Sequence, residues 1–375
     1  MTVPPLVHLI AGARPNFMKI APLWHALRDV PWCRPEIVHS GQHSDVNMSD
    51  WFFRDLELPA PHHHLNAQAG SHATLTATAM IAYDALCRQE RPALAVVVGD
   101  VDSTIACALT AKKLGIAVAH LEAGLRSFDR SMPEEINRIL TDSIADLLWT
   151  PSSDADQNLA REGVAPKRIA RVGNIMIDSL IMAQPRIRAV DEARVIGRAL
   201  PEKFAIVTLH RPSNVDHRER LGRIVQVLID IAQRIPVIFP IHPRTRRSLV
   251  AFGLAKSLEH PGIVLLDPLS YLEFMALVHK ARVIVTDSGG VQEESSYLGV
   301  PCLTLRESTE RPITVTLGTN RLTRVETVVE DLESILAKPL GGAPAIPLWD
   351  GCAAERVAES LKRQLVLLQI SSPLN

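Results

Sequence analysis

Short apolar runs rich in Val, Ile, Leu and Ala alternate with longer segments of helical periodicity along most of this chain. Near-continuous apolar character is typical of strands that are covered on both faces. The repeated order of strand and then helix predicts parallel sheets with helices on both sides. The predicted strands are Val7–Ala11, Glu36–Ser40, Leu94–Val98, Ala117–Leu121, Asp146–Thr150, Ala205–Leu209, Val237–Ile241, Ile263–Leu266, Val283–Thr286 and Cys302–Leu305.

Helical patterns lie between these strands, for example at Thr74–Arg88, Glu134–Leu147, Leu221–Arg234 and Leu272–Lys280. A length of 375 residues predicts two domains. A charged break at Pro185–Pro201 precedes a new strand, so we place the boundary near residue 180. We therefore predict an α/β fold with two Rossmann-like lobes, 1–180 and 181–352, whose parallel sheets face a cleft. The amphipathic segment at about 353–375 is expected to be a helix that packs back on the first lobe.

The composition excludes several classes of protein. A hydrophobic fraction of 47% indicates a well-buried globular chain, and a net charge of −1 gives no support to nucleic-acid or membrane binding. The five cysteines are widely spaced and contain no C-x-x-C pair, which fits reduced structural thiols. We find neither a signal peptide nor an apolar run of the roughly 18–20 residues that a membrane span needs, and we expect a cytoplasmic protein.

Charged residues follow several of the predicted strands, where open α/β sheets bind their ligands. The segment Gly12–Lys19 is a glycine turn in which Pro15 opens a helix, with Arg14 and Lys19 placed to face an anion. It matches neither the dinucleotide fingerprint nor the Walker loop. The alternative is a surface turn with solvated cations.

Three carboxylates also follow strands or flank the loops after them: Asp100, Glu122 and Glu134. Asp100 ends an apolar strand, and Glu122 and Glu134 flank a loop that contains a glycine. The alternative for Glu134 is ordinary helix chemistry, in which an acid stands in the first turn after Pro133 or pairs with Arg138.

The second half contains an anion-binding pattern. Ser288, Gly289 and Gly290 follow a strand and open a helix, so backbone amides can approach an oxygen-rich ligand. Glu294 stands a turn further on, where its carboxylate can accept from ribose hydroxyls, and Arg311 can add a cation. His210 ends another strand, where it can donate to a phosphate, although a structural role is the alternative.

We predict no metal and no cofactor. The run His62–His64 lies between prolines, and adjacent side chains point in different directions, which disfavours a metal site there. Elsewhere we find no cluster of His, Cys and carboxylates with ligand spacing.

Taken in order, these segments resemble the non-hydrolysing UDP-N-acetylglucosamine 2-epimerases over nearly the whole chain. The motifs that carry the resemblance are GARPNFMKIAPL, SGQH, VVGDVDST, HLEAGLRS, PEEINR, VGNIMIDSL, TLHRPSN, TDSGGVQEE and ERP. The resemblance implies a two-lobed glycosyltransferase-B fold with UDP in the cleft. It also implies an isomerase of polysaccharide biosynthesis that interconverts UDP-N-acetylglucosamine and UDP-N-acetylmannosamine, as a homodimer without an organic cofactor.

The resemblance also assigns roles to single positions. It implies catalysis by the carboxylates and a strand-end histidine, and binding of the UDP-sugar by a second set. The catalytic set is Asp100, Glu122, Glu134 and His210, and the binding set is Arg14, Lys19, Phe274, Ser288, Gly289, Gly290, Glu294 and Arg311. Phe274 falls where the family packs an apolar side chain near uracil.

Some positions depart from the family pattern. Asn16 replaces a usual Glu, and Pro212 and Ser213 replace Arg and Glu. Asp45 and His72 replace a Gln and an Arg in the region that binds an activating second substrate in many members. Activation therefore stays open, and so does a related substrate such as a UDP-diacetamido-uronate sugar.

The chemistry that the resemblance implies is elimination and re-addition of UDP through a 2-acetamidoglucal. C2 of the sugar is not next to a carbonyl, so its proton becomes acidic only when the diphosphate leaves C1. Inversion requires acid–base groups on both faces of the ring, which the three carboxylates would supply jointly. A glycosyltransferase, a nucleotide-sugar binding protein and a hydrolysing epimerase are the alternatives.

Overall fold

The computed structural model describes residues 3–41, 53–67 and 70–371. The chain divides into two compact units, which are described separately below. Unit 1 comprises Met1–Met182 together with Pro347–Asn375, and unit 2 comprises Ala183–Ile346. The chain passes from one unit to the other inside a helix, α7 (Ile175–Arg188), which continues through Pro185. The charged segment predicted from Pro185 therefore begins inside this helix, and the irregular part of the chain begins after Arg188.

The sheet of unit 1 has the order β3-β2-β1-β4-β5-β6-β7, and all its neighbouring strands are parallel. Its strands are β1 (Leu6–Ala11), β2 (Arg34–His39), β3 (His63–His64), β4 (Leu94–Val98), β5 (Ala117–Leu121), β6 (Leu147–Thr150) and β7 (Ile169–Arg171). β4 is buried along its whole length, as its sequence LAVVV predicts for a strand covered on both faces.

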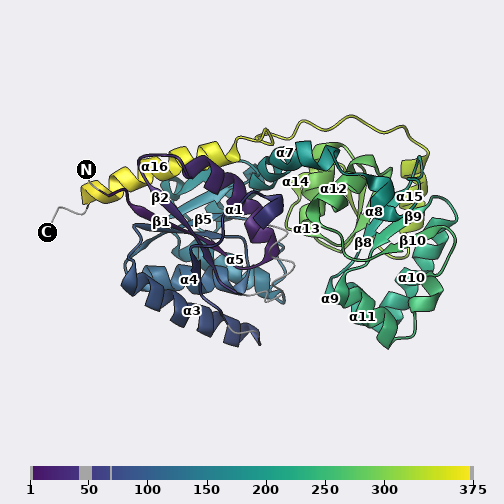
Figure 1. The fold of residues 1–375 in the computed structure, drawn as a ribbon, viewed down its shortest axis with the longest axis horizontal. Coiled ribbons are helices and arrows are strands. Elements are labelled where there is room, and N and C mark those ends of the chain that lie inside the picture. The colour runs from purple at the N-terminus through teal and green to yellow at the C-terminus, as the bar shows by residue number, and fades with distance from the viewer. Residues whose placement is uncertain (1–2, 42–52, 68–69, 372–375) are drawn as a thin grey trace. The chain divides into compact units, whose positions relative to one another are not determined.

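Helices connect these strands, as parallel pairing requires. They are α1 (Arg14–Leu27), α3 (His72–Gln89), α4 (Asp102–Lys113), α5 (Pro133–Ile144), α6 (Ser153–Arg161) and the 3-10 turn Pro166–Arg168. The C-terminal helix α16 (Ala353–Ser371) packs against α1, and Figure 1 shows the two side by side. Trp149 of β6 donates a hydrogen bond to Ser360 of α16, which ties the end of the chain to this unit.

The sheet of unit 2 is also parallel, with the order β10-β9-β8-β11-β12-β13. Its strands are β8 (Ala205–Thr208), β9 (Val237–Pro240), β10 (Ile263–Leu266), β11 (Val283–Thr286), β12 (Cys302–Leu305) and β13 (Asn320–Thr323). The connecting helices are α8 (Glu192–Ile196), α9 (Pro212–Val215), α10 (Arg218–Ala232), α11 (Pro243–Ala251), α12 (Tyr271–Lys280), α13 (Gly289–Leu298), α14 (Ile313–Thr316) and α15 (Val328–Leu336), with a 3-10 turn at Ala255–Leu258.

The order of the strands decides which polar segments meet. In unit 1, β4 lies between β1 and β5, so the segments that follow Ala11, Val98 and Leu121 leave the same edge of the sheet. In unit 2, β8 lies beside β11, so the segments after Thr208 and Thr286 are neighbours. The α/β prediction with parallel sheets is confirmed.

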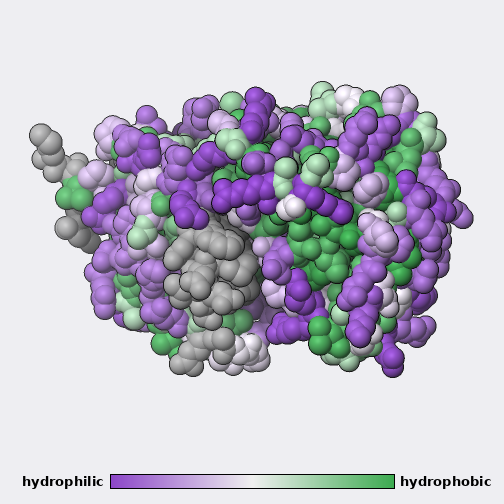
Figure 2. Space-filling model, turned by 45° about the vertical axis from the view of Figure 1, so that its right-hand side comes forward, coloured by the Kyte–Doolittle hydropathy of each residue, from purple (hydrophilic) through white to green (hydrophobic). Residues whose placement is uncertain are grey.

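The apolar side chains are largely buried inside the two units. The face in Figure 2 is mostly hydrophilic, with hydrophobic patches between the polar side chains. None of the helices in the described parts of the chain combines the length and the apolar character that crossing a membrane requires.

Candidate functional site

A buried ion pair lies at the carboxyl ends of β1, β4 and β5. Lys19, in the second turn of α1, donates to Oε2 of Glu122, which directly follows β5. Both side chains are buried, and a Cβ built on Gly99 after β4 would lie 3.1 Å from Lys19 Nζ and 3.5 Å from Glu122 Oε2. Three segments that are far apart in the sequence therefore converge on one point.

Glu122 also has an unusual backbone. Its φ is 73°, in the left-handed region that residues other than glycine seldom adopt. The amides of Glu122 and Ala123 both donate to the carbonyl of Trp149, which holds the bend. Strain of this kind is retained where the surroundings fix a side chain for a function.

Asn16 holds the turn between β1 and α1. Its Oδ1 accepts from the amides of Gly12 and Ala13 at 3.1 and 2.8 Å, and its Nδ2 donates to the carbonyl of Val98 at 3.0 Å. This buried amide binds the β1 turn to the end of β4. Asn16, which stands where the family usually has Glu, therefore has a structural role, because a carboxylate there cannot donate to the carbonyl of Val98.

Asp100 is held by an arginine of α5. Arg138 donates from Nε and Nη2 to Asp100 Oδ2 at 3.0 and 2.6 Å, and from Nη1 to Glu135 at 2.5 Å. Glu135 in turn accepts from the amides of Ser127 and Phe128. The expected alternative of a Glu134–Arg138 pair is replaced by this bridge, which fixes Asp100 and the loop before α5 together.

A second buried cluster lies under the same loop. His120 presents Nδ1 to Asp142 at 2.6 Å and Nε2 to the carbonyl of Gly99 at 2.8 Å. Asp142 also accepts from Arg126 and from the amide of Gly124. Burial favours the neutral form of Asp142, but His120 and Arg126 outweigh it and hold the pKa of the carboxyl below its ordinary value. The cluster anchors the segment that carries Glu122.

Two other predicted residues of unit 1 lie at the starts of helices. Glu134 is half-buried in the first turn of α5, directly after Pro133, on the helix that also carries Arg138. The backbone of Arg14 opens α1, and its side chain lies outside what the structure describes.

In unit 2, a buried carboxylate organises the ends of β8 and β11. Asp287 accepts from the amides of His210 and Arg211 and from Asn214 Nδ2, at 2.9 to 3.1 Å. Its Oδ1 also lies 3.1 Å from His210 Nδ1. Burial alone would raise the pKa of Asp287, but these donors, led by His210, lower it. His210 is thereby oriented, with about a third of its side chain exposed.

The start of α13 is shaped around Gly289. Ser288 is the N-cap residue, and Gly289 and Gly290 form the first turn. A Cβ on Gly289 would lie 2.7 Å from Arg311 Nη1 and 2.9 Å from Glu310 Oε1, so a larger residue would have to displace these two side chains. Arg311 is buried here between Glu310 at 2.7 Å and Glu293 at 2.8 Å. The helix start thus combines backbone donors with a nearby guanidinium, as an anion site requires.

Glu294 is buried in the same helix and accepts a hydrogen bond of 2.9 Å from the hydroxyl of Tyr271. Burial raises the pKa of Glu294 to about 8; the bond from Tyr271 opposes this rise, and the charge of Glu293 adds to it. Phe274 lies half-buried one turn from Tyr271 in α12. Tyr271 was not predicted, although it opens the same helix as Phe274.

Sequence reasoning also missed the residues that hold the predicted ones. Asn16, His120, Glu135 and Arg138 lie inside or beside the motifs, but only their partners from other strands reveal their roles.

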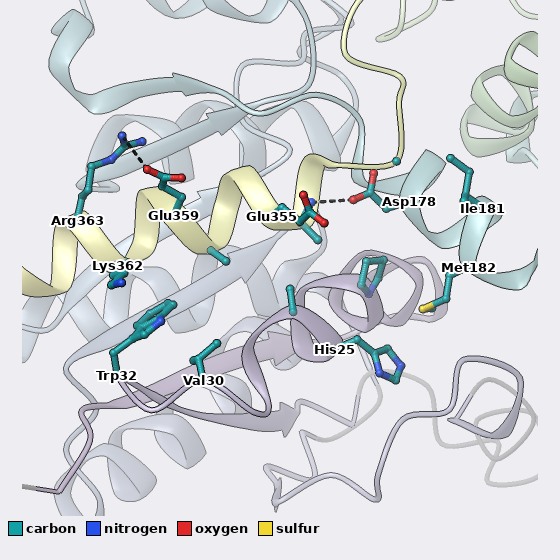
Figure 3. A pocket seen from close by; sticks show the side chains of 15 residues that line it. His25, Val30, Trp32, Asp178, Ile181, Met182, Glu355, Glu359, Lys362 and Arg363 are labelled. Atoms are coloured by element: carbon teal, nitrogen blue, oxygen red, sulfur yellow. Dashed lines mark hydrogen bonds and ion pairs between the residues drawn. The ribbon is translucent and has the colours of Figure 1, made fainter.

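A pocket of about 800 Å³ lies elsewhere in unit 1, between α1, α7 and α16 (Figure 3). Its lining includes Asp178, whose carboxylate accepts from the amide of Ala354 at 2.7 Å, and none of the predicted site residues.

Comparison with known proteins gives a consistent result. A family model described as UDP-N-acetylglucosamine 2-epimerase matches residues 25–362. The UDP-N-acetylglucosamine 2-epimerase of Methanocaldococcus jannaschii is 40% identical over 362 residues, covering 94% of this chain and 98% of that protein. Its crystal structure in complex with UDP-GlcNAc and UDP has a TM-score of 0.89 at 39% identity, covering 96% of this chain and 99% of that one.

Two further comparisons define the range of the similarity. The UDP-2,3-diacetamido-2,3-dideoxy-D-glucuronate 2-epimerase of Pseudomonas aeruginosa is 38% identical over 359 residues, covering 94% of this chain and 98% of that protein. The crystal structure of the glycotransferase of kitacinnamycin is 13% identical, with a TM-score of 0.54 over 98% of this chain and 96% of that one, and shares the fold alone. The family match over most of the length shows that this chain belongs to the UDP-N-acetylglucosamine 2-epimerase family of isomerases.

Proposed function

We propose that this protein inverts C2 of UDP-N-acetylglucosamine and so produces UDP-N-acetylmannosamine. The observation that carries the proposal is the convergence of Lys19, Glu122 and Asp100 at the carboxyl ends of neighbouring strands in a chain of this family. Buried cations and carboxylates in one place suit a reaction that moves both a proton and a leaving anion.

The proposed reaction has two halves. In the first, the bond from C1 to the diphosphate oxygen breaks, UDP leaves with the electron pair, and a base removes the proton from C2. The product is 2-acetamidoglucal, with a double bond between C1 and C2. In the second, UDP adds back to C1 and an acid delivers a proton to the opposite face of C2. No oxidant or reductant is needed.

Unit 1 would supply the acid and base groups. Glu122 pairs with Lys19 and Asp100 pairs with Arg138, so both carboxylates are held in fixed positions. Glu134 has no cation of this kind beside it among the described residues and completes the set of candidates. We assign the three carboxylates jointly to the two faces of the ring.

Unit 2 would hold UDP. The amides at Ser288–Gly290 and the guanidinium of Arg311 would face the diphosphate and stabilise the charge that develops on it as it leaves C1. The carboxylate of Asp287 holds the His210 ring through Nδ1, and Nε2 of that ring would donate to a phosphate oxygen. The carboxylate of Glu294 would accept hydrogen bonds from the ribose hydroxyls, and Phe274 would pack near the uracil.

One experiment tests the activity and separates its alternatives. The protein is incubated with UDP-N-acetylglucosamine in heavy water and followed by NMR. We expect deuterium at C2 and a mixture of two UDP-sugars. Release of free N-acetylmannosamine and UDP would indicate a hydrolysing enzyme, and the absence of both exchange and turnover would leave a binding protein or a transferase.

A second substrate is favoured by the relative from Pseudomonas aeruginosa, which is nearly as similar as the one from Methanocaldococcus jannaschii. Comparing kcat/KM for UDP-N-acetylglucosamine and UDP-2,3-diacetamido-2,3-dideoxy-D-glucuronate decides between them. We expect the former to be preferred; a reversed preference would assign the chain to the uronate.

The homodimer, the cytoplasmic location and the role in polysaccharide biosynthesis stay predictions. Light scattering of the purified full chain, with and without UDP, tests the first of these. A monomer under both conditions would contradict it.

A further inference from the structure

A group of side chains outside the proposed catalytic machinery has the composition of a metal site. His8 of β1, Glu36 of β2 and His63 of β3 offer two imidazole nitrogens and a carboxylate oxygen, and these atoms all lie within 4.8 Å of one another. Adjacent parallel strands cause this convergence, because His8 is in register with Glu36, and His63 is in register with Val38, two residues further along β2.

His8 has a buried nitrogen that nothing in the described residues satisfies. Its ring is fully buried, Nδ1 lies 3.2 Å from the hydroxyl of Tyr83, and Nε2 has no hydrogen-bond partner in the parts of the chain that the structure describes. A buried polar atom without a partner is costly, and native proteins seldom retain one without a reason. A metal ion bound to Nε2 would supply that reason.

The neighbours favour a ligand role for this ring. When Nδ1–H donates to the Tyr83 oxygen, Nε2 presents its lone pair, which is the outer-shell arrangement typical of metal-binding histidines.

The other two ligands are also preoriented. Nε2 of His63 lies 2.8 Å from Oε2 of Glu36, and both side chains are more than four-fifths buried. Oε1 of Glu36 is 3.2 Å from Arg34, so Oε2 is the oxygen directed to the group. Glu90 at the end of α3 lies 3.7 Å from His63 Nε2.

We propose that His8, Glu36 and His63 bind a divalent transition-metal ion, with Zn²⁺ the best fit to two neutral imidazoles and a carboxylate. Zn²⁺ binds nitrogen and carboxylate oxygen at about 2.0–2.2 Å, so binding draws the three ligand atoms inward from their present separations. Mg²⁺ and Ca²⁺, which prefer oxygen ligands, do not fit this set.

The role of the ion is structural. The ligands lie within the strands, whereas Lys19, Asp100 and Glu122 follow the ends of strands. β3 is a two-residue strand at the edge of the sheet, held to β2 by few backbone bonds. A metal that bridges β1, β2 and β3 pins this edge strand, and it stabilises the folded state because the unfolded chain lacks the assembled site.

The test uses the full chain without an affinity tag, stripped of metal by a chelator. Zn²⁺ is titrated in competition with a chromophoric chelator, and thermal unfolding is followed with and without Zn²⁺. We expect one tight site per chain and a higher unfolding temperature with the metal. Co²⁺ in place of Zn²⁺ should give the visible absorption of a four-coordinate site.

Variants assign the site to these residues. His63→Gln and Glu36→Gln, both at part-buried positions, should each weaken Zn²⁺ binding at least about tenfold and abolish the thermal shift. His64→Gln is the matched control, because His64 is the exposed neighbour on the same strand and should retain both effects. His8→Gln should behave like His63→Gln, provided that its unfolding without metal is cooperative. Equal Zn²⁺ affinity in the wild type and His63→Gln, or equal losses in His63→Gln and His64→Gln, would overturn the proposal.

Discussion

Lys19 and Glu122 form a buried ion pair although 103 residues separate them in the sequence. Their contact depends on the position of β4 between β1 and β5, which brings the segments after β1 and β5 together beside Gly99. The pair is also the place where the fold and the proposed chemistry meet, since Glu122 adopts a left-handed backbone there.

The Lys19–Glu122 pair should be strongly coupled in stability. Lys19→Met removes the lysine half of this buried pair, which we expect to lower the free energy of unfolding by about 3–5 kcal/mol. Glu122→Gln in the same chain should recover part of that loss. The measurement is a double-mutant cycle from urea unfolding at pH 7; additive effects of the two substitutions would show that the pair is not coupled.

The carboxylates of unit 1 should be required for turnover to a degree that their effect on stability does not explain. Asp100→Asn, Glu122→Gln and Glu134→Gln are expected to lower kcat by about 10²- to 10⁴-fold, the usual effect of losing a general acid or base. The readouts are epimerisation and C2 deuterium exchange, with unfolding midpoints as the check on folding. Asp84→Asn, on the exposed pair with Arg88 of α3, is the control and should retain full activity. Near-normal turnover in all three variants would refute the assignment.

Gly289→Ala should weaken UDP binding. The added methyl group would approach Arg311 Nη1 to 2.7 Å and displace it, together with Glu310, from the start of α13. We expect the dissociation constant of UDP, measured by calorimetry, to rise about tenfold or more, the equivalent of at least ~1.4 kcal/mol.

Gly222→Ala provides a matched control for that substitution. Gly222 lies inside α10, and a Cβ there meets nothing within 4 Å. Alanine at this position should stabilise the helix by about 0.5–1 kcal/mol and leave UDP affinity unchanged. Equal UDP affinity in both alanine variants would argue against an anion site at Gly289.

UDP binding should depend on the protonation of Glu294. Burial raises the pKa of this carboxyl to about 8, so it is mostly neutral at pH 7. When ribose hydroxyls donate to Glu294, UDP binds the ionised form of this carboxyl more tightly than the neutral form. The affinity of the protein for UDP should therefore rise by roughly an order of magnitude between pH 7 and 8.5. Glu294→Gln should abolish this rise, and Glu330→Gln on the exposed face of α15 should retain it. A flat pH profile in the wild type would contradict the role.

Asp178 should make the protein less stable as the pH rises. Burial raises its pKa from 3.8 to about 6, although the amides of Ala354 and Ala353 oppose the shift. Between these pH values the folded state binds a proton that the unfolded state has lost, so stability falls as pH increases and is constant above about pH 6. Asp178→Asn removes this dependence.

Urea unfolding at several pH values measures the effect. The free energy of unfolding of Asp178→Asn, minus that of the wild type, should increase by up to about 1.4 kcal/mol per pH unit between pH 4 and 6. Glu359→Gln, at an exposed position of α16 in Figure 3, should show no such trend. A wild-type curve parallel to that of Asp178→Asn would mean that the carboxyl titrates normally.

The strands that the pattern missed share one property. β3, β7 and β13 stand at edges of the sheets, are two to four residues long, and contain no apolar run of more than two residues. Edge strands are covered less than central ones, so their sequences lack the apolar run on which the prediction relies. The predicted helix Glu134–Leu147 likewise ends at Ile144, because Leu147 already belongs to β6.

The sequence by itself determined the α/β class, the central strands and the polar segments that follow them, because burial on both faces imposes a local pattern that can be read along the chain. Only the tertiary structure decided which of those segments became neighbours and which side chains paired. Arg138 bridges Asp100 and Glu135, and His63 meets His8 and Glu36, through the order of parallel strands. Strand order depends on long-range packing, and no local periodicity encodes it.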